Sequence, residues 1–509
     1  MSLPQPSRRL LFPVLALGLS LLVLAGLELG LRLFGAAAFE PDPFVGFAGS
    51  HPFLVKVGQG NEARCQVNPR HQPFFNEVSF PAPKPAASYR VFVAGGSGAL
   101  GFPFFEPGSF ARFLQVGLDL LEPGRPHQVI NAGGFGYASY RVARVVEEVL
   151  NYEPDLVVVM TGHNEFLEKR IYGEREQAGP ALIAVRSCLD RLRLYRELRQ
   201  AVTALRPSPA PLLKEEVAWE KYSRDSRQVA LTLDHYRYNL EKIVRLCRER
   251  NVPVVFLTLP SNLKDFPPYR SQHGKQLSPE ASAQWEAHYQ RGLSLLAESD
   301  SAAAVLEFDR AMELDSGYAA LQYARGRALL EQGRPEMAEL DFWWAVQLDA
   351  WPVRAFPEMN AAVREMAARG AIVADALSLF TAAAKDRIPG NDLFLDHCHP
   401  TLAGQALLAQ SVLLALAEKR VVPLPENWRP DYQQAARRYQ ESLGQGFLGE
   451  AYYRAAVEVG VNMARPQEGL GLAEAAFRLI PDHPKLPRLL ERLRQEAAAK
   501  AGAPLPEKP

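Results

Sequence analysis

Residues 89–101 read YRVFVAGGSGALG, a short run of strand-forming residues that leads directly into a glycine-rich turn. β-Branched and aromatic side chains dominate the run, as is typical of a buried strand. The turn contains Ser97. Because ligands bind at the carboxyl ends of the strands in parallel α/β sheets, Ser97 stands where such a fold places its chemistry.

Further strand candidates follow at residues 127–132, 155–160 and 252–259, with a weaker one at 371–376. Helical stretches, for example at 140–150 and 231–250, lie between them. Strands that alternate with helices predict a parallel sheet with helices on both faces. We therefore expect an α/β fold with Ser97 at one edge of the sheet.

The other candidate site residues also follow strands or close the sheet region. The second strand runs into NAGGFGYAS, which contains Gly136, and the third runs into TGHNEF, which contains Asn164. DLFLDHCHPT at 392–401 places Asp396 three residues before His399. This set is chemically complete: Ser97 attacks an acyl carbonyl, His399 removes its proton, and Asp396 orients the histidine.

Three groups could stabilise the oxyanion of such a reaction. They are the Ser97 amide, the Gly136 amide and the Asn164 side chain. His163 and His397 are rival bases, but the spacing from Asp396 and the Pro400 that follows favour His399.

Other kinds of site are open on the residues alone. Asp396, His397 and His399 could bind a metal, but such a cluster is more often a catalytic Asp–His pair, and the sequence has no helical H-E-x-x-H. A dinucleotide loop would use the glycines of residues 95–101 together with Tyr238-x-x-x-Lys242. The second strand, however, ends without the acidic residue that binds a ribose hydroxyl. We expect neither a metal nor a cofactor.

The four blocks resemble those of the SGNH (GDSL-like) hydrolase superfamily, which carry Ser, Gly, Asn and His. Here the blocks match Ser97, Gly136, Asn164 and Asp396-x-x-His399, within residues 88–165 and 353–415. The resemblance implies a three-layer α/β/α, flavodoxin-like parallel sheet. It also implies a serine esterase whose substrate is an O-acyl ester, such as an O-acetylated glycan. An O-acyltransferase that uses the same serine is the alternative.

Two positions depart from the family pattern. Gly96 stands where the family usually has Asp before the serine, and Glu165 stands where it has Asp after the asparagine. Neither change removes a member of the predicted triad. The residues themselves assign no role to Glu165.

Residues 285–352 contain an internal repeat of 34 residues. Five small or bulky positions recur at this offset: Gly292, Leu295, Ala304, Phe308 and Ala311 return as Gly326, Leu329, Ala338, Phe342 and Ala345. Paired helices of a tetratricopeptide repeat interlock at such positions, and the chain resembles membrane-anchored SGNH hydrolases that carry these repeats. A plain helical hairpin is the alternative. The repeats predict a protein partner. The alternative to an enzyme is a repeat-bearing scaffold protein whose hydrolase site is vestigial.

The amino-terminal segment predicts a membrane anchor. Residues 10–27 carry no charge, and the apolar run continues to residue 34, which is long enough to cross a bilayer. Arg8 and Arg9 precede it, which favours a cytoplasmic amino end and an exported catalytic domain, periplasmic if the protein is bacterial. A cleaved signal peptide and a buried core helix are the alternatives.

Composition narrows the functional class. The 57 basic and 57 acidic residues cancel, which argues against a nucleic-acid-binding protein. The 4 cysteines are too few and too scattered for a disulfide scaffold or a thiolate zinc site.

The 509 residues are enough for several domains. We expect an anchor at 1–36, a stalk or cap at 37–88, a hydrolase domain at 89–284 (with a helical insertion) and 353–420, two repeats at 285–352, and a helical, repeat-like region at 421–509.

Overall fold

The computed structural model describes residues 6–33, 52–167 and 224–502, together with a few positions between 185 and 198. The chain divides into two compact units. One consists of Met1–Phe53 and Ile171–Val217, and the other of Leu54–Arg170 and Ala218–Pro509. The predicted site residues and the helical repeats all lie in the second unit. Most of the predicted insertion in the hydrolase domain lies outside the described residues.

The second unit is built on a five-stranded sheet. Its strands pair in the order β5-β4-β6-β7-β8, and every pair is parallel. All five lie at the predicted places: β4 (Tyr89–Gly95), β5 (His127–Gly133), β6 (Leu156–Met160), β7 (Val254–Leu257) and β8 (Ile372–Ala374). Every residue of β4, β6 and β7 is buried, as expected for a parallel sheet covered on both faces.

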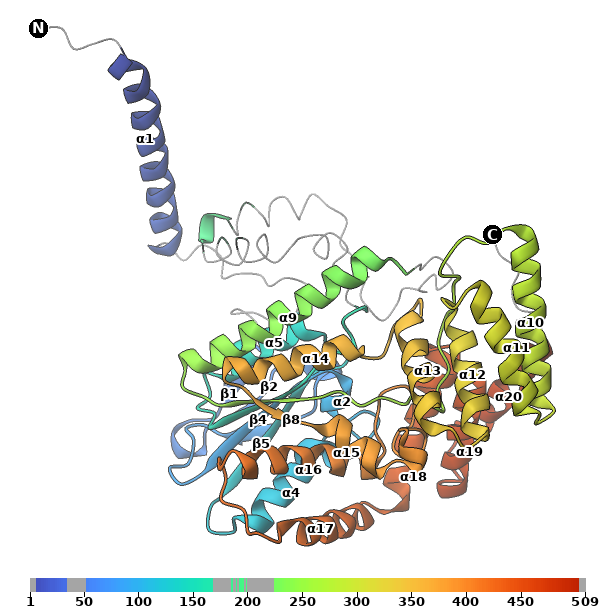
Figure 1. Ribbon diagram of the computed structural model, residues 1–509. Coiled ribbons are helices and arrows are strands. Elements are labelled where there is room, and N and C mark those ends of the chain that lie inside the picture. The colour runs from blue at the N-terminus through green and yellow to red at the C-terminus, as the bar shows by residue number, and fades with distance from the viewer. Residues whose placement is uncertain are drawn as a thin grey trace, which may run out of the picture. The chain divides into compact units, whose positions relative to one another are not determined.

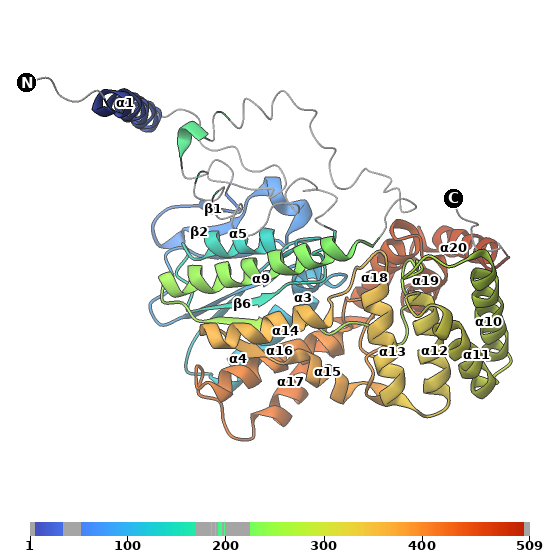
Figure 2. The same ribbon diagram turned by 45° about the horizontal axis from the view of Figure 1, so that its top comes forward.

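Helices cover both faces of this sheet. Figure 1 shows α5 (Ser139–Val149), α9 (Ser226–Glu249) and α14 (Pro357–Glu365) on one face, and α4 (Phe110–Leu121) and α16 (Leu402–Glu418) on the other. Figure 2 shows the same layers from a second direction. Numbered along the chain, the strand order is 2-1-3-4-5, which is the flavodoxin-like order. The predicted three-layer α/β/α fold is confirmed.

Local sequence explains where several of these helices begin. Ser109 caps α4 by accepting a hydrogen bond from the Arg112 amide, and Asp225 and Thr401 do the same for α9 and α16. Such side chains bind amides that the first helical turn leaves without a partner. The core-facing sides of α4 and α5 are apolar, so both helices bury one face against the sheet.

A small antiparallel sheet precedes β4. It consists of β1 (Leu54–Val57), β2 (Arg64–Val67) and β3 (Ser79–Pro81). Arg90 of β4 donates hydrogen bonds to the Pro81 and Tyr152 carbonyl oxygens, and the Phe80 ring packs edge-on against Phe92. The carboxy-terminal part of the predicted stalk or cap is thus packed on the large sheet, and its residues 37–51 lie outside the described chain.

Residues 279–348 fold into two helical hairpins. These are α10 (Pro279–Ala297) with α11 (Ser301–Leu314), and α12 (Ala319–Glu331) with α13 (Pro335–Leu348). A Cβ atom added at Gly292 would lie 2.4 Å from the Phe308 ring, and one at Gly326 would lie 2.9 Å from the Phe342 ring. The repeated positions therefore interlock within each hairpin. Membership of the tetratricopeptide family stays a prediction.

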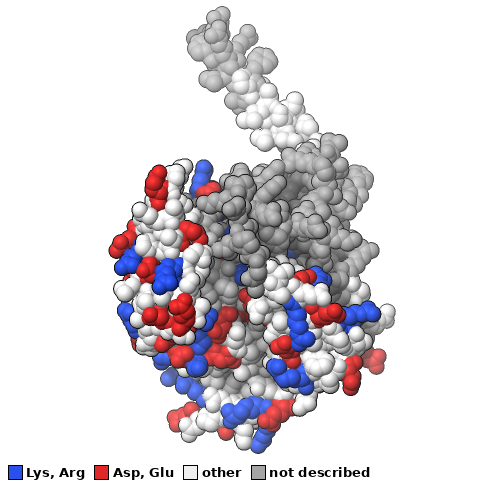
Figure 3. Space-filling view, turned by 90° about the vertical axis from the view of Figure 1, so that its right-hand side faces the viewer, with Lys and Arg blue, Asp and Glu red and all other residues white. Residues whose placement is uncertain are grey.

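The carboxy-terminal region is helical, with a core of its own. It contains α17 (Trp428–Ser442), α18 (Gly444–Ala456), the π-helical turn η6 (Val457–Asn462), α19 (Pro466–Leu479) and α20 (Leu486–Gly502). The buried core residues are Ala456, Ala473, Ala476, Leu486, Leu489, Leu490 and Leu493. On the face of the molecule in Figure 3, acidic and basic side chains of the described residues are intermixed, so that face carries no surface of a single sign.

The first unit contains α1 (Pro6–Leu33). Its segment Leu15–Leu33 is long and apolar enough to cross a membrane, judged by length and composition alone. Near its carboxyl end, Glu28 accepts hydrogen bonds from the Arg193 and Leu194 amides, and the Arg193 side chain donates to the Leu31 carbonyl. Part of the segment 171–217 is therefore tied to the end of this helix.

Candidate active site

Ser97, His399 and Asp396 form one continuous chain of hydrogen bonds. The Ser97 Oγ and His399 Nε2 atoms are 2.8 Å apart, and His399 Nδ1 lies 2.5 Å from Asp396 Oδ2. All three side chains are buried. The structure thus brings together the three residues that sequence analysis assigned to proton transfer and nucleophilic attack.

Ser97 is the first residue of α2 (Ser97–Leu100), a single helical turn that follows β4 directly. A turn this short leaves its carbonyl groups without partners inside the helix. Asn131 donates a hydrogen bond to the Ala99 carbonyl, and Asn76 donates one to the Leu100 carbonyl. Two buried asparagines from distant segments therefore hold the serine turn in place.

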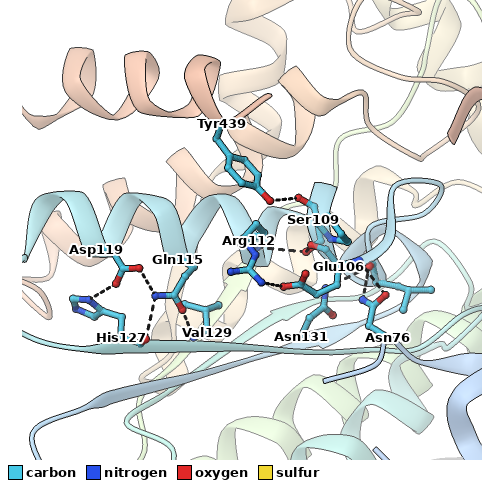
Figure 4. A network of polar contacts seen from close by, with 12 residues as sticks. Asn76, Glu106, Ser109, Arg112, Gln115, Asp119, His127, Val129, Asn131 and Tyr439 are labelled. Atoms are coloured by element: carbon cyan, nitrogen blue, oxygen red, sulfur yellow. Dashed lines mark hydrogen bonds and ion pairs between the residues drawn. The ribbon is translucent and has the colours of Figure 1, made fainter. Parts of the chain in front are cut away.

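A network of polar contacts extends this support (Figure 4). Asn76 also accepts a hydrogen bond from the Glu106 amide, and the Glu106 carboxylate pairs with Arg112 on α4. Further along α4, Gln115 accepts from the Val129 amide and donates to the His127 carbonyl, which ties this helix to β5. Hydrogen bonds and an ion pair thus hold together the elements on either side of the Ser97 turn. Sequence analysis did not select the side chains that make these contacts.

Asp396 is held as an ionised carboxylate. Its Oδ1 atom accepts hydrogen bonds from the Cys398 and His399 amides, at 2.9 and 2.8 Å. Burial by itself would raise the pKa of Asp396, but the His399 imidazole and these hydrogen bonds outweigh it and hold that pKa below its ordinary value. A charged Asp396 can orient His399 and stabilise its protonated form.

The two rival histidines are placed differently. His163 Nδ1 accepts a hydrogen bond from the Ala355 amide, and burial, with His397 and His399 nearby, lowers the pKa of His163 to about 3. His397 packs against Phe266, and burial lowers its pKa to about 3 as well. Both are therefore neutral, and His399 is the histidine that contacts Ser97 Oγ.

The two predicted oxyanion donors, Gly136 and Asn164, come from loops that contact each other. Gly136 has a φ of +72°, in the left-handed region that favours glycine, and open space lies where its Cβ would be. Asn164 Nδ2 donates one hydrogen bond to the Tyr137 carbonyl at 3.1 Å, which leaves its second hydrogen for an oxyanion. Asn164 and the loop that carries Gly136 are thereby joined.

A steric constraint explains why the residue before Ser97, Gly96, is a glycine. A Cβ atom at Gly96 would lie 2.5 Å from Asn164 Nδ2 and 2.9 Å from the Tyr137 carbonyl oxygen. A larger side chain at this position would not fit without displacing Asn164. Glycine at position 96 therefore permits the close approach of the Asn164 amide to the backbone before Ser97.

The carboxy-terminal helices contact two loops beside the site, one around Pro103 and one around Pro268. Sequence analysis missed these contacts because no motif marks the arginines that make them. Arg454 of α18 donates to the Pro103 carbonyl at 3.0 Å, and its guanidinium lies 5.4 Å from the Phe105 ring centroid. Arg465, just before α19, donates to the Pro268 carbonyl, and its guanidinium lies 4.3 Å from the Tyr269 ring centroid. The helical region at 421–502 is thus part of the surroundings of the site.

The potential metal ligands are engaged with one another. Ligand atoms of Asp396, His397, Cys398 and His399 lie within 4.8 Å of one another. Both ring nitrogens of His399 face other side chains, and both oxygens of Asp396 accept hydrogen bonds. A metal ion at this cluster would have to break the Ser97–His399–Asp396 chain.

Comparisons with known proteins give the following matches. No family model and no curated protein matches the chain. Among solved structures, it is similar to an acetylxylan esterase of Geobacillus stearothermophilus (12% identity, 65% of this chain and 95% of that one, TM-score 0.31). It is also similar to a putative GDSL-like lipase of Parabacteroides merdae (12%, 66% and 98%, 0.32) and a lipase/acylhydrolase of Enterococcus faecalis (15%, 65% and 96%, 0.30). At such identities the chemistry has to be judged from the site itself.

Proposed function

We propose that this protein is a membrane-anchored serine esterase of the SGNH type that hydrolyses O-acyl esters outside the cytoplasm. The observation that carries the proposal is the 2.8 Å contact between Ser97 Oγ and His399 Nε2, with Asp396 behind the histidine. A serine beside an oriented imidazole is the arrangement that activates a hydroxyl for attack on an acyl group.

The reaction follows from this geometry. Ser97 Oγ attacks the acyl carbonyl carbon while His399 Nε2 takes the hydroxyl proton, and the carbonyl oxygen becomes an oxyanion near the Gly136 amide and the Asn164 side chain. The ester C–O bond then breaks, and His399 returns the proton to the departing alcohol. Water, activated by His399, attacks the acyl-serine and releases the carboxylic acid and free Ser97.

We extend the proposal to the substrate and the setting. The ester is an O-acylated glycan, and a sugar hydroxyl in place of water would convert the same acyl-serine into a transferase intermediate.

The segment Leu15–Leu33 anchors the chain, with the amino end in the cytoplasm, because Arg8 and Arg9 precede it. The helical hairpins at 279–348 bind a protein partner. Protease protection in membrane vesicles tests the topology: cytoplasmic accessibility of the second unit would overturn it.

Labelling with a fluorophosphonate tests the chemistry. The full-length protein in detergent is treated with the probe beside the Ser97→Ala variant, and the modified peptide is mapped. We expect labelling at Ser97 that is lost in the variant, after which acetylated glycans are screened as substrates. A folded wild-type protein that takes no label would contradict the esterase and favour a repeat-bearing scaffold.

A further inference from the structure

A buried carboxylate lies beside the site and has no part in the reaction above. Glu165 directly follows Asn164 and is 6% exposed. Both of its oxygens accept hydrogen bonds from Ser139: Oε1 from the backbone amide at 2.9 Å and Oε2 from the hydroxyl at 2.7 Å. The Ser139 hydroxyl accepts a further hydrogen bond from Asn239 on α9. Three buried side chains from three elements thus form one network.

The contact with Ser139 is made at the start of a helix. Ser139 is the first residue of α5, and the preceding residue, Ala138, has no side chain that could cap it. The first amides of a helix need acceptors from outside it, and a negative charge is favoured there. The sequence at the start of α5 provides no capping side chain, and Glu165 supplies the acceptor and the negative charge from a different loop.

The segment that this contact fixes is the one that carries Gly136. It connects β5, which ends at Gly133, to α5, which begins at Ser139. Asn164 binds the Tyr137 carbonyl of the same segment at 3.1 Å. Two consecutive residues after β6 therefore hold the segment at two points, one on either side of Ala138.

We propose that Glu165 is a positioning residue that sets the separation of the Gly136 amide and the Asn164 side chain, and so shapes the oxyanion hole. The inference rests on the proposed esterase function. Loss of the Glu165–Ser139 contact releases the far end of the Gly136 segment. The two donors then lose their alignment toward the oxyanion, although neither has been changed.

The surroundings of Glu165 support a dependence on pH. Burial raises the pKa of Glu165 to about 7, although the hydrogen bonds from Ser139 oppose this rise. The titratable group that faces it from α9 is Tyr236, whose pKa burial raises well above its ordinary value, so this phenol stays neutral. Protonation of Glu165 near neutral pH weakens both hydrogen bonds to Ser139, because a neutral acid is the poorer acceptor.

The test compares Glu165→Gln, Glu165→Asp and Ser139→Ala with wild type in the full-length protein. Asp375→Asn is the matched control, because Asp375 also caps a helix, α15 (Ala376–Ala383), and accepts from the Thr258 hydroxyl. Activity on 4-nitrophenyl acetate gives kcat and KM, and circular dichroism checks folding. We expect kcat to fall about 10-fold in Glu165→Gln, with KM within about 3-fold and partial rescue in Glu165→Asp, because loss of alignment affects an interaction made mainly in the transition state.

The pH profile separates a positioning role from a purely structural one. As the pH falls through about 7, protonation of Glu165 should lower the kcat/KM of wild type by up to about 10-fold, the loss expected for the neutral Glu165→Gln side chain. This step should be absent from the profile of Glu165→Gln, so the ratio of wild-type to variant kcat/KM should fall toward one at acid pH. A folded Glu165→Gln with the wild-type kcat and a ratio that stays constant with pH, or an equal loss of kcat in Asp375→Asn, would overturn the inference. Absence of Ser97-dependent activity in wild type would instead overturn the proposed function.

Discussion

Ser97 and His399 are 302 positions apart in the chain, yet Oγ of one lies 2.8 Å from Nε2 of the other. Ser97 is placed by the first parallel strand of the sheet, and His399 by a loop that follows the last. All helical repeats intervene between them in the sequence. The reacting groups are therefore assembled by the sheet, and the inserted hairpins leave this arrangement intact.

Replacing the side-chain donor of the oxyanion hole should reduce turnover. Asn164→Ala removes the amide that borders Ser97, and the loss of one such donor typically costs about two to three orders of magnitude in kcat. Steady-state kinetics on 4-nitrophenyl acetate measure the effect. The variant should still take a fluorophosphonate label at Ser97, more slowly than wild type. A kcat within about 3-fold of wild type would remove Asn164 from the oxyanion hole.

A methyl group before the nucleophile should have a comparable effect. The φ of Gly96 is −83°, which any residue can adopt, so the contact of its Cβ with Asn164 Nδ2 at 2.5 Å decides the outcome. We expect Gly96→Ala to lower kcat about 100-fold by displacing Asn164. Gly98→Ala is the control, because its Cβ would lie 3.3 Å from the end of the flexible Met160 side chain. Equal activity of the two variants would contradict the steric argument.

The carboxy-terminal helices should influence turnover through the loop after Ser97. Arg454 holds the Pro103 carbonyl, and the neighbouring Phe102 ring packs edge-on against His399 at 4.8 Å. Arg454→Met should lower kcat about 3- to 10-fold, since misplacement of a catalytic group is costly even when it remains present. The exposed Arg438 of α17 provides the control variant, Arg438→Met. If both variants turn over at the wild-type rate, the helical region acts independently of the site.

Acid should destabilise the fold through its two buried, neutral histidines. His163 and His397 have pKa values of about 3 in the folded protein, below the ordinary value of about 6.5 that they regain on unfolding. Below pH 6.5 the unfolded state therefore binds more protons, so stability falls as pH falls toward 3. Between pH 7 and pH 5 the loss is about 2 kcal/mol per histidine.

Urea unfolding at the two pH values measures this loss. His163→Gln should reduce the difference by about half relative to wild type. A difference that is unchanged in His163→Gln would show that the acid sensitivity arises elsewhere in the molecule.

The sheet and most of the candidate site could be predicted from the sequence because their signals are local. A strand such as residues 89–94 is recognisable from its own β-branched residues, and Asp396 and His399 are close enough in sequence for their pairing to be expected. The blocks around Gly136 and Asn164 likewise stand at strand ends, where a parallel sheet gathers its functional groups.

Tertiary structure alone decided the remaining features, because they depend on contacts between distant segments. The 2.8 Å contact that joins His399 to Ser97, and the close approach of the Asn164 amide that excludes a side chain at Gly96, exist only in the folded chain. Glu165 reaches a helix start 26 positions away, and Arg454 reaches a loop 351 positions away. Residue types and spacing are properties of short segments, whereas these contacts exist only once the sheet, its loops and the carboxy-terminal helices have packed together.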